Sequence, residues 1–202
     1  MKKHNLEFKI KELEIIAQEL KSSICPLRVG ATQAVPGEGN PDADILFIGE
    51  APGEQEDKLG RPFVGAAGKL LDKLLASIDL KREDVFIANI EKFRPPGNRD
   101  PLPEEISACF PFLERQIKII QPKLIITLGR HALKKMFEWD RDKIIEKNIS
   151  IGEFHGKLIK GKKGDYFPSY HPAAGLYHPS TKIEIEKDFQ KIPPILHYLP
   201  CK

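Results

Sequence analysis

The chain has 202 residues, a length that favours one domain with one core, although two small lobes would also fit. Hydrophobic residues make up 41% and charged residues 30% of it, a composition typical of globular proteins. Because no apolar run reaches membrane-spanning length and the first residues lack the apolar core of a signal peptide, we expect a cytoplasmic protein. The net charge of +3 permits nucleic acid as a partner without requiring it, and three scattered cysteines do not suggest a secreted disulfide scaffold.

Apolar periodicity predicts strands that alternate with helices along most of the chain. In chain order the predicted elements are a helix over 6–21, a strand over 45–48 that ends at Gly49, a helix over 68–78, a strand over 85–89, a helix over 104–120, a strand over 124–128 and a short helix over 130–137. Such alternation favours a parallel sheet covered by helices on both faces, with the strands ending at one common edge.

The C-terminal part of the chain is predicted to begin with a glycine-flanked hairpin over 151–166. The segment 167–171 follows, and a final helix starts near Ser180 or Thr181. The hairpin contains four lysines in a stretch of seven residues, at positions 157, 160, 162 and 163. They indicate either a solvated turn or a basic patch that contacts phosphate.

Polar side chains follow two of the predicted strands directly. Glu50 comes after the strand that ends at Gly49, and Asn89 ends the next strand. His171 reaches the same region from the C-terminal part of the chain. Because ligands of open α/β sheets bind at the edge where parallel strands end, these residues suggest a hydrolase that activates water and reads a polar ligand with an amide.

Five motifs, in register over most of the chain, resemble the family 4 uracil-DNA glycosylases. They are Gly49-Glu50-Ala51-Pro52-Gly53, Gly60-Arg61-Pro62-Phe63-Val64-Gly65, Asn89, Arg94-Pro95-Pro96-Gly97-Asn98-Arg99 and His171-Pro172-Ala173. The resemblance implies a single glycosylase-like domain over residues 1–202, with a three-layer α/β/α fold around a mainly parallel four-stranded sheet. It also implies that the protein flips uracil out of DNA and hydrolyses its N-glycosidic bond.

The resemblance assigns a role to each residue of the expected pocket. It implies that Phe63 stacks on the flipped uracil and that Asn89 reads the edge of the base, with Gly49 and Ala51 beside them. His171 is implied to stabilise negative charge at the uracil O2. Glu50 is implied to position or deprotonate the attacking water, or to stabilise the cationic sugar. The alternatives are a core residue for Phe63, a turn cap for Asn89, an ordinary loop histidine and an acidic loop cap for Glu50.

The DNA contacts are also taken from the resemblance. Leu176 resembles the apolar wedge that enters the duplex as the base leaves. The expected contacts to DNA phosphates or to its backbone are Lys92, Arg94, Asn98, Arg99, Ser169 and the lysine hairpin, although a solvated surface charge is the alternative for each cation. Tyr177 stands where the family often has arginine. We expect uracil-containing DNA, single- or double-stranded, as the partner of a monomer.

The expected metal site departs from the family. Family 4 enzymes hold a [4Fe–4S] cluster with four cysteines, and those positions are Ser22, Cys25, Phe93 and Cys109 in this chain. Since two of the four residues cannot supply a thiolate, we predict no metal and no cofactor. Phe93, Cys25 and the first helix are predicted to form a small satellite core in place of the cluster.

Three other functions are compatible with parts of the sequence. A related group of uracil-DNA binding proteins traps its product covalently through a histidine after the second strand, but residues 92–109 contain no histidine, and Ala51 stands where those proteins tend to carry glutamine. A non-catalytic DNA-binding or assembly protein on the same scaffold is a second alternative. A nucleotide-binding enzyme is disfavoured because neither of the common phosphate-binding glycine motifs follows a predicted strand.

Overall fold

The computed structural model describes residues 2–141 and 149–199. Its sheet has six strands in the order β1-β3-β2-β4-β6-β5. The strands are β1 (Glu38–Gly39), β2 (Ile45–Gly49), β3 (Phe86–Asn89), β4 (Leu124–Leu128), β5 (Ile159–Lys160) and β6 (Asp165–Ser169). The four central strands are parallel, as predicted, whereas β1 and β5 pair antiparallel at the two edges, so the sheet is mixed.

Nine α-helices and three short 3₁₀ helices complete the described part of the chain. The α-helices are α1 (Lys2–Lys21), α2 (Glu54–Leu59), α3 (Ala66–Ala76), α4 (Pro103–Ile120), α5 (Arg130–Arg141), α6 (Ile151–Phe154), α7 (Pro172–Tyr177), α8 (Pro179–Gln190) and α9 (Ile192–Tyr198). The 3₁₀ helices are η1 (Pro26–Gly30), η2 (Arg82–Asp84) and η3 (Pro96–Asn98). Among the described residues, no helix is both long and apolar enough to cross a membrane.

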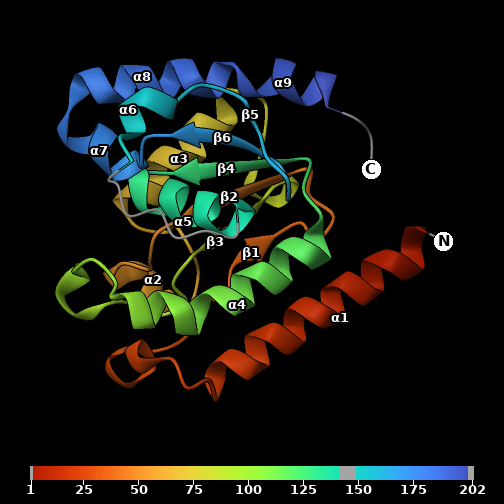
Figure 1. Ribbon diagram of the computed structural model, residues 1–202, viewed down its shortest axis with the longest axis vertical. Helices are drawn as coiled ribbons and strands as arrows, with labels where there is room; N and C mark the ends of the chain where they lie inside the picture. Colours follow the sequence, from red (N-terminus) through yellow and green to blue (C-terminus); the bar gives the residue numbers. More distant parts are fainter. Residues whose placement is uncertain (1, 142–148, 200–202) are drawn as a thin grey trace.

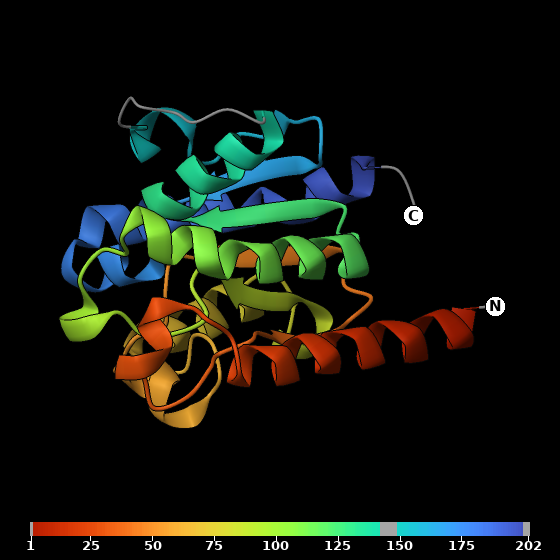
Figure 2. The same ribbon diagram turned by 60° about the horizontal axis from the view of Figure 1, so that its bottom comes forward.

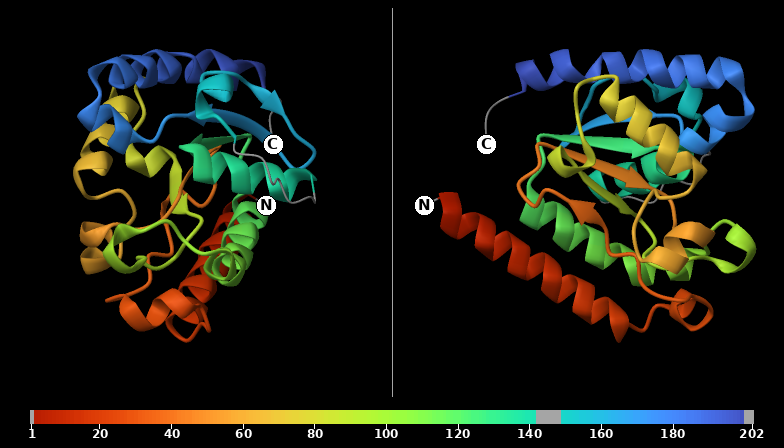
Figure 3. Two further views of the ribbon diagram at one scale, coloured as in Figure 1. Left: turned by 60° about the vertical axis from the view of Figure 1, so that its left-hand side comes forward. Right: turned by 180° about the vertical axis from the view of Figure 1, so that it is seen from behind.

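Helices cover both faces of the sheet, which gives the expected three layers. Alternate residues of β2 point to opposite faces, because side chains alternate along a strand. Phe47 packs in one core with residues of α3, α8 and α9, and Ile48 packs in a second core with residues of α4 and α5. Figure 3 shows α3, α8 and α9 on one side of the strands when the molecule is seen from behind.

A third, smaller core lies between α1 and α4. It contains Ile16, Leu20, Cys25, Leu27, Phe93 and Cys109, all of them buried. Figure 2 shows α1 alongside α4 at the margin of the molecule, away from the sheet. The predicted satellite core of Phe93, Cys25 and the first helix is therefore confirmed.

The C-terminal part differs from its prediction in three ways, of which one is that a further helix, α9, follows the predicted final helix, α8. The hairpin predicted over 151–166 begins with the short helix α6, and only β5 and β6 pair as a hairpin. The helix α7 was not predicted, and it directly follows His171. His171 itself keeps an extended backbone, with φ −66° and ψ 133°, as expected for a residue before proline.

Candidate functional site

A pocket of about 370 Å³ opens at the edge where the four parallel strands end. Glu50 follows β2, Asn89 ends β3 and His171 comes two residues after β6, so three separate strands deliver them to one place. Phe63 and Ala51 also line the pocket. In Figure 1 this edge faces left, towards α7. The structure thus brings together the residues that the sequence placed in one pocket.

Phe63 is held in a left-handed backbone conformation with φ 51°, which a large L-residue adopts only when its surroundings impose it. The carboxylate of Glu56 accepts the N–H groups of Val64 and Gly65, at 2.8 Å each. From the other side, the guanidinium of Arg82 donates to the carbonyl oxygens of Pro62 and Phe63, at 2.6 and 3.0 Å. These contacts fix the backbone of the loop at Phe63, whose ring packs on the core and also lines the pocket.

The amide of Asn89 carries an unused acceptor. Asn89 is buried, and its Oδ1 has no hydrogen-bond partner among the described residues. A Cβ at Gly49 would lie 2.4 Å from this oxygen and 2.7 Å from Cζ of Phe63, so only glycine lets both side chains come so close. Because an unpaired buried acceptor is costly, this oxygen is suited to a ligand N–H.

His171 is a neutral donor in this pocket. Its Nδ1 accepts the N–H of Ala173 at 3.1 Å, so the proton of the neutral ring sits on Nε2. Burial lowers the pKa of His171 to about 4. Its ring stacks on Phe63 with 5.5 Å between centroids and an interplanar angle of 29°. Behind it, Gly129 has φ +90°, and a Cβ there would lie 3.1 Å from the Cβ of His171.

The pKa of Glu50 is shifted upwards, whereas that of His171 is shifted downwards. Burial and, after it, the nearby carboxylate of Asp100 raise the pKa of Glu50 to about 7, while the Arg130 guanidinium acts against them. His131 lies on the far side of Glu50, with its Nδ1 4.0 Å from Oε1 of Glu50 and its Nε2 3.4 Å from Oδ2 of Asp100. Glu50 therefore gives up its proton near neutral pH, in the range useful for a general base.

Four of the residues predicted to contact DNA are at or near the rim. Asn98 and Arg99 line the pocket. Arg94 donates through Nε to Oδ1 of Asn98 at 2.8 Å, and Arg99 pairs with both oxygens of Glu105. Leu176, 44% exposed, stands on α7, which begins at the pocket. Their roles toward DNA stay predictions.

The prediction for Lys92 and Ser169 is wrong. Both are fully buried and cannot touch a DNA backbone. The ammonium of Lys92 turns inward, where it donates to Gln116 Oε1 and to the carbonyl oxygens of Pro36 and Asn89. Ser169 is the last residue of β6, between β4 and β5 in the sheet.

The lysine hairpin, for which a phosphate contact and a solvated turn were the two interpretations, lies away from the pocket. Its turn, residues 161–164, precedes β6, whose first residue Asp165 pairs with Leu124 at the start of β4. It therefore belongs to the edge of the sheet opposite the pocket. Lys160 forms an ion pair with Asp165 there, so the solvated turn is the better interpretation.

The residues at the four expected cluster positions do not fit a [4Fe–4S] cluster. Ser22 is exposed and its hydroxyl donates to the carbonyl of Glu19. The ring of Phe93 is buried in the satellite core. Only Cys25 and Cys109, whose sulfurs lie 2.8 Å apart, can supply thiolates, which is two of the four that such a cluster requires.

Sequence reasoning missed the residues that support this pocket. Glu56 and Arg82 hold the Phe63 loop from 8 to 20 residues away in sequence, and Asp100 acts on Glu50 across the pocket. A second cavity of about 390 Å³ reaches Glu50 from the side of α4 and α5. No local sequence pattern predicts these contacts, because they join residues that come together only when the loops fold.

Comparison with known proteins shows the family of the chain. The model of the Uracil DNA glycosylase superfamily matches residues 36–196. A type-4 uracil-DNA glycosylase of Sulfurisphaera tokodaii is 53% identical over 89% of this chain and 83% of its own. Those of Archaeoglobus fulgidus and Thermotoga maritima are 47% and 43% identical, each over 89% of this chain and over 90% and 92% of their own. The chain belongs to the uracil-DNA glycosylase superfamily, among relatives of type 4.

Proposed function

We propose that the pocket binds a uracil flipped out of DNA and that its residues hydrolyse the bond between uracil N1 and deoxyribose. The chain is a uracil-DNA glycosylase by family, its relatives are named type-4 uracil-DNA glycosylases, and uracil excision of this kind serves DNA repair. The observation that carries the assignment of residues is the unpaired Asn89 Oδ1, buried beside the Phe63 ring and the neutral His171. Uracil offers its N3–H to that acceptor and its face to the ring.

Selectivity in this proposal follows from the edge of the base. Cytosine has an acceptor where uracil has N3–H, so cytosine would leave Asn89 Oδ1 unpaired and set two acceptors against each other. An unpaired buried polar group costs about 1–3 kcal/mol, and a pocket built on such groups discriminates strongly. Leu176 on α7 is proposed to fill the space that the base leaves in the duplex.

In the proposed reaction, negative charge forms on uracil next to His171 and positive charge forms on the sugar next to Glu50. As the N-glycosidic bond breaks, its electron pair goes to uracil, and His171 Nε2–H donates to the O2 that becomes negative. The sugar becomes cationic at C1′, where the Glu50 carboxylate stabilises it and orients water. Water adds to C1′, its proton passes to Glu50, and the products are free uracil and an abasic site.

The remaining features of the proposal concern cofactor, partners and location. We propose that the chain works without the [4Fe–4S] cluster, because two of the four positions hold serine and phenylalanine. It is proposed to act as one domain and as a monomer, in the cytoplasm, on single- or double-stranded DNA. A covalent trap is not favoured, since residues 92–109 contain no histidine.

An oligonucleotide with one uracil and a labelled 5′ end tests the proposal. Alkali cleavage after incubation reports abasic sites, and denaturing gels without alkali report covalent adducts. Glu50→Gln, Asn89→Ala and His171→Ala are each expected to slow excision by at least about 100-fold, with Lys162→Ala at the opposite edge of the sheet unchanged. Wild-type rates in all three pocket variants would refute the assignment, and an adduct without turnover would establish the trap instead.

A further inference from the structure

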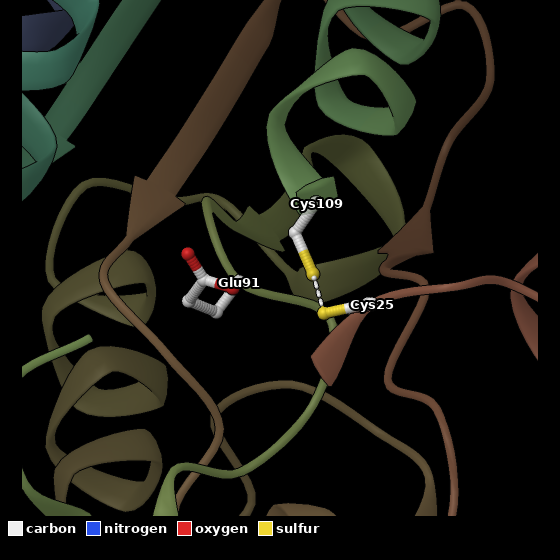
Figure 4. A group of neighbouring side chains, drawn as sticks. All are labelled: Cys25, Glu91 and Cys109. Atoms are coloured by element: carbon white, nitrogen blue, oxygen red, sulfur yellow. Dashed lines mark hydrogen bonds between the residues drawn. The ribbon is translucent and has the colours of Figure 1, made fainter. Parts of the chain in front are cut away.

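The two described cysteines form a buried group with a carboxylate. Cys25 precedes η1, Cys109 lies in α4, and Glu91 stands two residues after the end of β3. Their two sulfurs and one carboxylate oxygen all lie within 4.8 Å of one another, and all three residues are buried. Figure 4 shows the carboxylate of Glu91 to one side of the paired sulfurs.

The burial of the Glu91 carboxylate is not explained by any hydrogen bond to the described residues. Glu91 is fully buried, and neither of its carboxylate oxygens accepts a hydrogen bond of normal geometry from a described residue, although the nearby Cys109 thiol acts to lower its pKa against the larger effect of burial. An isolated buried carboxylate is strongly unfavourable, and such an orphan group in a native protein indicates an ion or another missing partner.

We propose that Cys25, Glu91 and Cys109 bind one divalent transition-metal ion, of which Zn²⁺ is the best match. Two thiolates and a carboxylate are ligands that Zn²⁺ accepts, whereas Mg²⁺ and Ca²⁺ require oxygen ligands. This site differs from a four-cysteine cluster site in its ligands and in holding a single ion.

The charges around the group fit a divalent ion. Two thiolates and one carboxylate carry three negative charges, so a divalent cation leaves one. Burial lowers the pKa of Lys92 to about 7, whereas Cys109 and Glu91 act to raise it, and the protonated side chain offsets that charge. Lys92 is anchored for this task by Gln116 Oε1 and by two backbone carbonyls.

A disulfide explains less of the site. It would join Cys25 and Cys109 but leave Glu91 as unpaired as before. A metal ion gives all three groups a partner. Binding requires the sulfurs to separate from 2.8 Å to about 3.8 Å, the spacing that two Zn–S bonds of about 2.3 Å give in tetrahedral geometry. The ion would tie the segment after α1 to α4 and to the loop after β3.

Cobalt binding tests the proposal directly. The full-length protein, stripped with EDTA and kept reduced, is titrated with Co²⁺, whose thiolate charge-transfer absorption reports sulfur ligands, and Zn²⁺ is then added in competition. We expect one equivalent of Co²⁺, displaced by Zn²⁺, and a Tm that rises with Zn²⁺. Cys25→Ser and Cys109→Ser should abolish the charge-transfer band, and the matched control Cys201→Ser should leave it unchanged.

Glu91→Gln keeps the shape of the side chain and removes its charge. It should weaken Zn²⁺ binding by more than about 100-fold, beyond the effect of losing an outer partner of a ligand, and it should remove the Zn²⁺-dependent rise in Tm. Circular dichroism and an unchanged rate of uracil excision establish that the variant is folded.

Several results would overturn the proposal. They are the absence of a cobalt band while all thiols are reduced, a Zn²⁺ affinity that Glu91→Gln leaves intact, a Cys25–Cys109 disulfide that persists in millimolar thiol, and iron-sulfur absorption in the purified protein.

Discussion

Gly49→Ala is the substitution that tests the pocket most sharply. Gly49 ends β2 in a backbone conformation open to alanine, because it is not among the glycines with positive φ. Any effect must therefore come from the added methyl group itself. That group would lie 2.4 Å from Asn89 Oδ1 and 2.7 and 2.8 Å from two carbons of the Phe63 ring.

The size of the effect follows from these distances. Real Cβ atoms essentially never approach other heavy atoms closer than 3.0 Å, so Asn89 Oδ1 must retreat by about 0.6 Å at the least. The Phe63 ring cannot yield freely, because Glu56 and Arg82 hold its loop. We expect an overpacking cost of about 1–3 kcal/mol in stability. A misplacement approaching 1 Å in a pocket costs about 100-fold in rate, or about 2.7 kcal/mol.

Single-turnover excision from a uracil oligonucleotide measures the effect on rate, and denaturant unfolding measures the effect on stability. Gly164→Ala is the matched control, because its new Cβ would only touch Ile125 Cδ1 at 3.4 Å, far from the pocket. It should excise uracil at the wild-type rate. If Gly49→Ala were as active as the control, Asn89 and Phe63 would not form the base-binding surface that we describe.

Three further substitutions have defined outcomes. Glu50→Gln should add about 2 kcal/mol of stability at pH 8 and nothing at pH 4. The pKa of Glu50 is about 7 in the folded protein and 4.5 ordinarily, so the wild-type protein loses stability as pH rises through this range, whereas the neutral glutamine does not. The figure is reduced because Glu50 is partly exposed, and denaturant unfolding at both pH values measures it. Glu56→Ala should free the two N–H groups after Phe63 and slow excision about tenfold or more, measured as kcat/KM. Phe93→Ala should cost about 3–5 kcal/mol in unfolding free energy, with excision unchanged in the protein that remains folded. A loss below about 1 kcal/mol would show that the satellite core contributes little.

The pH profile of excision gives an independent check on the same pocket. With Glu50 acting as carboxylate, the rate for the free enzyme should rise with pH through about 7 and then level off. His171 should not limit the rate above pH 5, because its pKa of about 4 keeps it neutral there. A rate that falls between pH 6 and 8 would show that protonated Glu50 or His171 is the active form.

The central fold could be predicted because its strands are continuous apolar runs. Residues 45–48 and 124–128 are buried on both faces, and this leaves a plain pattern in the sequence. The edge strands β1 and β5 have two residues each and so carry no periodicity. The helix α6 is a single turn, too short to distinguish from the strand that was expected there.

The pocket could be predicted only as far as its motifs reach. Glu50, Asn89 and His171 stand at strand ends, where topology alone brings them together. Lys92 was misplaced because sequence shows a lysine but not its direction, and here an acceptor 24 residues away, on Gln116, draws it inward. Glu91 could not be singled out from the sequence either, because only the folded structure shows that its buried carboxylate lies beside Cys25 and Cys109.

Burial lowers the pKa of His171 and raises the pKa of Glu50, and both shifts favour the same reaction. It keeps His171 neutral, so that its Nε2–H is a donor whose strength is needed only when O2 of uracil becomes negative. It makes the Glu50 carboxylate unfavourable until a positive charge forms near it. Under the proposed function that charge appears at C1′ in the transition state. Both groups then bind the transition state better than the substrate, and burial increases that difference because it reduces the screening of both interactions.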